Sequence, residues 1–130
     1  MTAMTAEPPT VSNPSILIVD DDPRVLDALE RALKQAGLRE VVALVTFDDA
    51  RRALRAGRFD VLITDVRLGA FNGLQLAVLA HDQNPGIQLI VFSGFDDPVL
   101  RREAEGLGAV YLVKPVTSRQ LLELMRSRAT

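Results

Sequence analysis

Acidic, basic and hydroxyl side chains in this sequence stand directly after short apolar runs. Asp20 and Asp21 follow "ILIV", and Asp65 ends the run in "VLITDVRL". Ser93 ends "LIVFS", and Lys114 follows "VYLV". If these runs are strands of one parallel sheet, their carboxyl ends meet at one edge of the sheet. Three carboxylates, one hydroxyl and one ammonium group are therefore expected to lie together there.

This set of groups suits the phosphorylation of an aspartate. Mg²⁺ prefers oxygen ligands, and two or three carboxylates are enough to hold it beside a phosphate. Once a metal ion neutralises the approaching charge, a carboxylate such as Asp65 can act as the nucleophile on phosphorus. Lys114 and Ser93 would then donate hydrogen bonds to the oxygens of the transferred group.

Helix capping is the alternative explanation for the clustered acids. Asp22 precedes a proline and is the expected N-cap of the helix that follows. A second Asp-Asp-Pro stretch, 96–98, also precedes an expected helix, and there we assign both acids to capping. Capping does not explain why Asp20 and Asp21 coincide with Asp65 at one sheet edge. We therefore assign these three carboxylates to a site.

The elements that position these residues alternate between strand and helix. Four of the five apolar runs are almost continuously apolar, as in strands buried on both faces of a parallel sheet. The expected strands are 16–19, 41–47, 61–64, 89–93 and 110–113. Helical spacing is present in 25–36, 77–81, 100–108 and 119–127. The alternation predicts an α/β fold, flavodoxin-like: a doubly wound five-stranded parallel sheet of order 2-1-3-4-5, with five helices on both faces.

Composition excludes several classes of protein. The chain has 130 residues, of which 48% are hydrophobic and 25% charged, as in one globular domain. A formal net charge of −2 offers no broad basic surface for nucleic acid, and the absence of cysteine excludes disulfides. Residues 1–14 contain no basic start and no apolar core of signal-peptide length, and no apolar run elsewhere approaches the ~18 residues that span a bilayer. These features predict a cytoplasmic protein without nucleic-acid or membrane contact.

Residues 1–14 are predicted to be a flexible tail, and 15–130 the domain.

The motifs together resemble a known family. They are "IVDDD", Asp65 with Gly73 eight residues later, "FSG" and "VYLVKP". Over residues 15–128 the sequence is similar to the receiver domain of bacterial two-component response regulators, of the chemotaxis-regulator type. The resemblance implies that Asp65 is the phosphoacceptor and that the cofactor is Mg²⁺. It also implies a cis peptide bond after Lys114.

The resemblance assigns a role to each matching residue. Asp21 would bind the metal directly, Asp20 mainly through water, and the backbone carbonyl of Arg67 would be the remaining protein ligand beside Asp65. On phosphorylation, the hydroxyl on the fourth strand moves toward the phosphoryl group and an aromatic on the fifth strand turns inward, which changes the face of helix 4, strand 5 and helix 5. That face would bind a downstream protein, an output domain or a second copy. The two switch residues would be Ser93 and Tyr111.

Two features near the acceptor depart from the family or vary within it. Four residues after the acceptor the family commonly has proline, whereas this chain has Gly69. We expect this glycine to loosen the loop and weaken the preorganisation of the metal site. Arg67 and Phe95 match two variable positions flanking the site, which in the family influence how long the phosphoryl group survives. Arg67 would lie over the acyl phosphate and Phe95 would shield it from water, unless both are merely rim side chains.

The predicted function is that of a signalling receiver. It would accept a phosphoryl group on Asp65 from a histidine kinase or a histidine phosphotransfer protein, and it would catalyse only its own phosphorylation and dephosphorylation. The alternative is a pseudo-receiver that binds partners without phosphorylation. A phosphatase of the haloacid dehalogenase type is disfavoured because Arg67 stands where its second acid would be. A dinucleotide-binding domain is disfavoured because the Gly-x-Gly-x-x-Gly turn is lacking.

Overall fold

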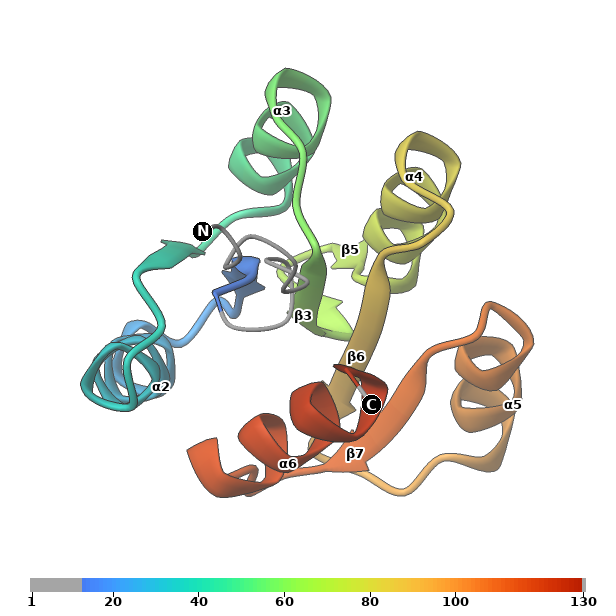
Figure 1. Cartoon of the computed structure of the whole chain (residues 1–130). Helices are drawn as coiled ribbons and strands as arrows, with labels where there is room; N and C mark the ends of the chain where they lie inside the picture. The colour runs from blue at the N-terminus through green and yellow to red at the C-terminus, as the bar shows by residue number, and fades with distance from the viewer. Residues whose placement is uncertain (1–12, 130) are drawn as a thin grey trace.

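A five-stranded, fully parallel sheet forms the centre of the protein (Figure 1). The computed structural model describes residues 13–129, so most of the expected tail lies outside the described residues. The strand order is β2-β1-β3-β6-β7, which in sequence order is the predicted 2-1-3-4-5. The strands are β1 (Ser15–Val19), β2 (Glu40–Leu44), β3 (Val61–Asp65), β6 (Gln88–Ser93) and β7 (Val110–Val113).

Helices cover both faces of the sheet, as predicted. Helices α2 and α6 lie over one face of the sheet, and α3, α4 and α5 lie over the other (Figure 1). Their buried side chains belong to the two separate cores under these faces. Among the described residues, no helix is long and apolar enough to cross a membrane. The helices are α2 (Pro23–Gln35), α3 (Phe47–Ala56), α4 (Leu74–Gln83), α5 (Pro98–Gly106) and α6 (Ser118–Ala129).

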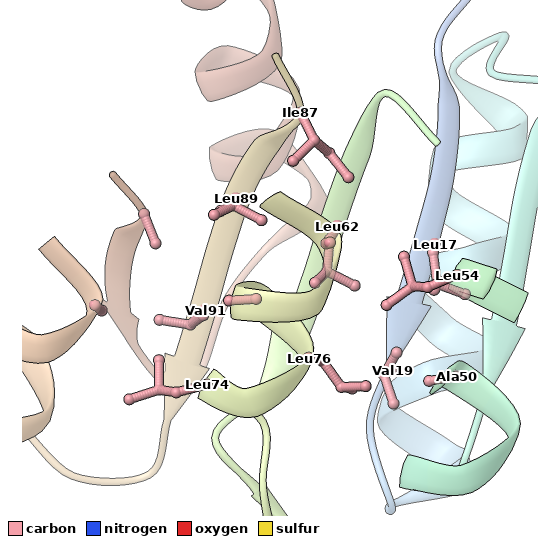
Figure 2. Packing of buried hydrophobic residues seen from close by; sticks show 14 of the residues in the cluster. Leu17, Val19, Ala50, Leu54, Leu62, Leu74, Leu76, Ile87, Leu89 and Val91 are labelled. Carbon is pink, nitrogen blue, oxygen red and sulfur yellow. The ribbon is translucent and has the colours of Figure 1, made fainter. Parts of the chain in front are cut away.

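The continuous apolar runs are buried because both faces of each central strand are covered. Every residue of β3 and β6 is buried. Along β1, Leu17 and Val19 point to the core under α3, α4 and α5, whereas Ile16 and Ile18 point to the core under α2 and α6. Figure 2 shows the first of these cores, in which Leu17 lies close to Leu54 of α3.

The second strand is shorter at its carboxyl end than the prediction of 41–47. β2 ends at Leu44, and Thr46 is the N-cap of α3, its side chain accepting a hydrogen bond from the amide of Asp49. A threonine hydroxyl at this position satisfies an amide that the first helical turn leaves free, so the apolar Phe47 begins a helix instead of ending a strand. The alternation pattern implied this helix, but its residues had not been identified.

The two Asp-Asp-Pro stretches begin helices in the same way. Asp22 accepts a hydrogen bond from the amide of Arg24, and Asp97 accepts from the amide of Val99. Asp96, in contrast, is not a cap, and the expectation that it caps α5 is wrong. Its carboxylate pairs with Arg101 at 2.8 Å, because the long arginine side chain reaches back past the first turn of the helix.

Gly73, at the start of α4, brings that helix close to the end of β3. Its amide donates to the carbonyl of Val66 at 2.6 Å. A Cβ added at Gly73 would overlap the backbone carbonyl oxygen of Asp65 and approach the hydroxyl of Thr64. Because a backbone carbonyl at the end of a central strand cannot move aside, only glycine fits here.

We therefore predict that Gly73→Ala lowers the free energy of unfolding by about 2–3 kcal/mol through overpacking. Gly106→Ala is the matched control, since a Cβ there meets nothing within 4 Å, and it should leave stability unchanged or raise it by up to about 1 kcal/mol. Urea unfolding of the three proteins measures both effects. Equal stability of Gly73→Ala and the native chain would contradict the close-packing explanation.

Candidate functional site

Three carboxylates meet at the carboxyl edge of the sheet, as the sequence pattern predicts. Asp20 and Asp21 follow β1, and Asp65 is the last residue of the neighbouring β3. One carboxylate oxygen from each residue lies within 4.8 Å of the other two. Asp20 and Asp65 are buried, whereas Asp21 is exposed. The cluster is therefore open to solvent on the Asp21 side.

Lys114 joins the cluster from the edge strand β7. Its Nζ donates a hydrogen bond to Asp65 Oδ2 at 2.9 Å and lies 3.2 Å from Asp20 Oδ2. The backbone amide of Lys114 donates to the carbonyl of Ser93, and the peptide bond to Pro115 is cis, as the resemblance implied. One ammonium group thus contacts two of the three acids.

Burial and charge act on these groups in opposite directions. Burial raises the pKa of Asp20, and the Asp22 amide and the Lys114 ammonium offset this only in part. Burial by itself would lower the pKa of Lys114, but the hydrogen bond to Asp65 and the charges of Asp65 and Asp20 outweigh it, so the pKa of Lys114 is raised. The lysine is therefore held in its charged form.

Lys114 alone does not satisfy the three acids, and a divalent cation would suit them better. Asp20 Oδ2 is buried and, despite its short distance to Lys114, it lacks a partner with hydrogen-bond geometry. All the side-chain ligands are carboxylate oxygens, which suits a hard cation such as Mg²⁺ or Ca²⁺. A cation would also relieve the repulsion that one ammonium group leaves among three carboxylates.

The two predicted switch residues are both buried. Ser93 ends β6, and its hydroxyl accepts a hydrogen bond from the amide of Phe95 at 3.3 Å. Tyr111 lies inside the core, and its hydroxyl donates to the carbonyl of Phe95 at 2.7 Å. The guanidinium carbon of Arg101 lies 4.8 Å from the centre of the Tyr111 ring, and the same guanidinium binds Asp96. This contact of Arg101 was not predicted, because it depends on how α5 packs against β7.

The two rim residues contact each other. The guanidinium carbon of Arg67 lies 5.6 Å from the centre of the Phe95 ring, and 65% of Phe95 is exposed. The backbone amide of Arg67 donates to Asp65 Oδ1 at 3.2 Å, which places this residue next to the predicted acceptor. The sequence named both rim positions, but only the structure pairs them.

A short hairpin beside Asp65 was missed by sequence reasoning. Its antiparallel strands are β4 (Arg67–Leu68) and β5 (Phe71–Asn72). Gly69 does not leave this loop irregular: it has a φ of 62° in the turn, and its amide donates to Asp21 Oδ2 at 3.3 Å. Two residues between short strands, with a glycine available for positive φ, are a hairpin signal that could have revealed it.

Comparison with known proteins identifies the family. Residues 16–126 match the family described as response regulator receiver domain. The chain is a response regulator receiver domain. It is therefore a phosphoacceptor signalling domain and not a conventional enzyme.

Curated and solved relatives agree with this assignment. The receiver is similar to the C4-dicarboxylate transport transcriptional regulatory protein DctD of Pseudomonas aeruginosa, with 34% identity over 115 residues, or 85% of this chain and 24% of DctD. It is also similar to the transcriptional regulatory protein PrrA of Mycobacterium tuberculosis, with 35% identity over 90% of this chain and 50% of PrrA. The receiver spans about a quarter to a half of the length of the curated relatives it matches first.

Solved structures share its fold. A CheY-like receiver domain protein from Methanospirillum hungatei is 30% identical, with a TM-score of 0.83 over 90% of this chain and 94% of the other. A response regulator protein from Burkholderia pseudomallei is 26% identical, with a TM-score of 0.80 over 90% of this chain and 69% of the other. The latter was solved with a phosphorylated aspartic acid, a calcium ion and citrate.

The buried charge of Asp20 leads to a prediction for stability. Because its pKa is raised on folding, the folded protein holds the Asp20 proton more tightly than the unfolded chain does. The charged form therefore lowers stability at neutral pH, and this cost is lost as the pH falls through the raised pKa. We expect Asp20→Asn to raise the free energy of unfolding at pH 7, without divalent cations, by about 1–2 kcal/mol.

Urea unfolding tests this expectation, with Asp27→Asn as the control for an exposed acid. Asp27 pairs with Arg31 on the surface of α2, so its loss should change stability by less than about 0.5 kcal/mol. Added Mg²⁺ should stabilise the native receiver more than Asp20→Asn. A variant at Asp20 that is less stable than the native receiver without cations would show that the buried charge carries no cost.

Proposed function

We propose that Asp65 accepts a phosphoryl group from the phosphohistidine of a histidine kinase or a histidine phosphotransfer protein. The observation that carries this proposal is the Lys114 ammonium, 2.9 Å from Asp65 Oδ2, beside the carboxylates of Asp20 and Asp21. The phosphorylated aspartic acid of the Burkholderia pseudomallei relative supports it. The complete set of acids and the lysine speaks against the alternative, a pseudo-receiver that signals without phosphorylation.

The carboxylates of Asp20, Asp21 and Asp65, with the backbone carbonyl of Arg67, would hold Mg²⁺. The metal would supply positive charge that lets a carboxylate approach a phosphoryl group. An oxygen of Asp65 forms the new bond to phosphorus as the phosphorus–nitrogen bond to the partner's histidine breaks, and the imidazole leaves with its proton on the other ring nitrogen. The ammonium of Lys114 then donates to a phosphoryl oxygen.

Ser93 and Tyr111 would transmit the phosphorylation of Asp65 to the rest of the domain. When the Ser93 hydroxyl turns toward the phosphoryl group, the amide of Phe95 loses its acceptor. The carbonyl of Phe95 is bound by the Tyr111 hydroxyl, so this segment couples the acceptor site to the aromatic ring. Arg101 on α5 stacks on that ring and would carry the change into the helix.

The face of α5, β7 and α6 is the proposed signalling surface. It corresponds to helix 4, strand 5 and helix 5 of the predicted fold. Val99 on α5 is 55% exposed and Val110 on β7 is 36% exposed, so apolar side chains are available for a partner. We assign this surface to a downstream protein, an output domain or a second copy of the receiver.

The remaining assignments follow the sequence. We propose a receiver domain in 15–130 and a cytoplasmic location. The names of the curated relatives describe transcriptional regulation. We assign no direct nucleic-acid or membrane contact to this chain, because its net charge is −2.

Phosphorylation is tested by incubating the protein with acetyl phosphate and Mg²⁺ and measuring its intact mass. We expect the native chain to gain one phosphoryl group and Asp65→Asn to gain none. Asp21→Ala should lose most of the gain because a metal ligand is missing, whereas Asp97→Ala, which removes only the cap of α5, should retain it. No gain on the native chain, or an equal gain on Asp65→Asn, would refute the phosphoacceptor function.

Arg67 and Phe95 are predicted to slow hydrolysis of the phosphorylated form. As a contacting pair of which Arg67 lies next to Asp65, they would keep water away from the acyl phosphate. Arg67→Ala and Phe95→Ala should each speed the loss of the phosphoryl mass about two- to fivefold, as expected from a cation–π contact of about 0.5–1 kcal/mol. The double variant should be little faster than either single variant, because each one breaks the same pair. Native hydrolysis rates in both single variants would mean that the pair is a rim feature without effect on lifetime.

A further inference from the structure

We propose that the backbone amide of Gly69 positions the Asp21 carboxylate for metal binding, so that the β4–β5 hairpin is part of the metal site. This builds on the metal binding proposed above for Asp20, Asp21 and Asp65. Gly69 is thus a positioning residue that acts through Asp21. It stands where the family commonly has proline, which cannot make this contact.

The three carboxylates are held in different ways. Asp20 is fully buried and accepts a hydrogen bond from the Asp22 amide at 2.8 Å. Asp65 is buried and bound by Lys114. Asp21 is exposed, and the donor that contacts it is the Gly69 amide, 3.3 Å from Oδ2 and 48 residues away in sequence. Without this contact, the exposed Asp21 side chain would have to give up its rotamer freedom when the metal binds.

The backbone of Gly69 makes the contact available. Its φ of 62° lies in the left-handed region, which proline cannot adopt because its ring holds φ near −65°. Proline also has no amide hydrogen to donate. A carboxylate has about four lone-pair sites, so one amide bond to Oδ2 leaves Asp21 free to bind a cation. The glycine therefore supplies a donor at a position where the family usually has none.

Contacts on both sides of Gly69 keep the hairpin in place. Leu68 is only 3% exposed and belongs to the core under α3, α4 and α5. The ring of Phe71 stacks on Phe47 of α3, with 4.7 Å between ring centres and 14° between planes. Because Leu68 and Phe71 pair across the hairpin, both anchors act on the turn that contains Gly69. The amide is thus attached to a rigid part of the fold.

The experiment compares Mg²⁺ affinity, measured by NMR titration of the full chain with MgCl₂. Gly69→Pro removes the amide hydrogen, and we expect it to bind Mg²⁺ about three- to tenfold more weakly, as for one exposed hydrogen bond to a charged group. Gly69→Asn keeps the amide, and asparagine tolerates the left-handed region, so its affinity should stay within about twofold of native. A Cβ at Gly69 meets nothing within 4 Å, so the asparagine side chain has room.

Gly37→Asn is the matched control for substituting a positive-φ glycine. Gly37 has a φ of 102° with open space around it, and it lies after α2, away from the acids. Its replacement should leave the Mg²⁺ affinity at the native value. Native affinity in Gly69→Pro, or an affinity in Gly69→Asn as weak as in Gly69→Pro, would overturn the proposal.

A second measurement decides the matter if Gly69→Pro fails to fold. Without metal, the Gly69 amide should exchange its hydrogen at least about twofold faster in Asp21→Ala than in the native chain, because its acceptor is gone. Unchanged exchange would show that the hydrogen bond is absent. If instead the native chain itself fails to bind Mg²⁺, it is the proposed function that fails. If the native chain binds Mg²⁺, Asp21→Ala abolishes the binding and Gly69→Pro leaves it intact, only the role of Gly69 is rejected.

Discussion

The repulsion among three carboxylates at one sheet edge is the constraint on which the rest of the site depends. Asp20 and Asp65 are buried within a few ångströms of each other, and Lys114 is the one side-chain cation that the described residues bring to them. Charge of this kind lowers folding stability unless a cation compensates it. This destabilisation is located where the metal and the phosphoryl group would bind. The fully buried strands β3 and β6 stabilise the fold and offset it.

Two routes lead outward from this cluster. On one side, hydrogen bonds run from Ser93 through the backbone of Phe95 to Tyr111, whose ring stacks against Arg101 of α5. On the other side, Asp21 is joined through Gly69 to the β4–β5 hairpin, and so to α3. These contacts are the neighbours through which the phosphorylation proposed for Asp65 would act on α5 and α3.

Sequence reasoning succeeded where burial or backbone geometry leaves few choices. Strands buried on both faces must be continuously apolar, and parallel strands with right-handed connections allow few orders, so the sheet and the position of Asp65 could be predicted. It failed where polar and apolar signals compete over a few residues. Phe47 continues an apolar run, but the Thr46 cap makes it helical. Asp96 looks like a cap, but its pairing with Arg101 depends on the position of the helix.

The sequence by itself determined which groups can meet, because the hydrophobic pattern sets the strand ends and the predicted site residues stand at or directly after those ends. Only the tertiary structure decided how the surrounding residues are paired. The stacking of Arg67 on Phe95 and of Arg101 on Tyr111 depends on side-chain directions across separate elements. The bond from Gly69 to Asp21 depends on a positive φ in a turn. Neither side-chain direction nor a single φ leaves a periodic signal in the sequence, since both follow from packing that forms only when distant segments come together.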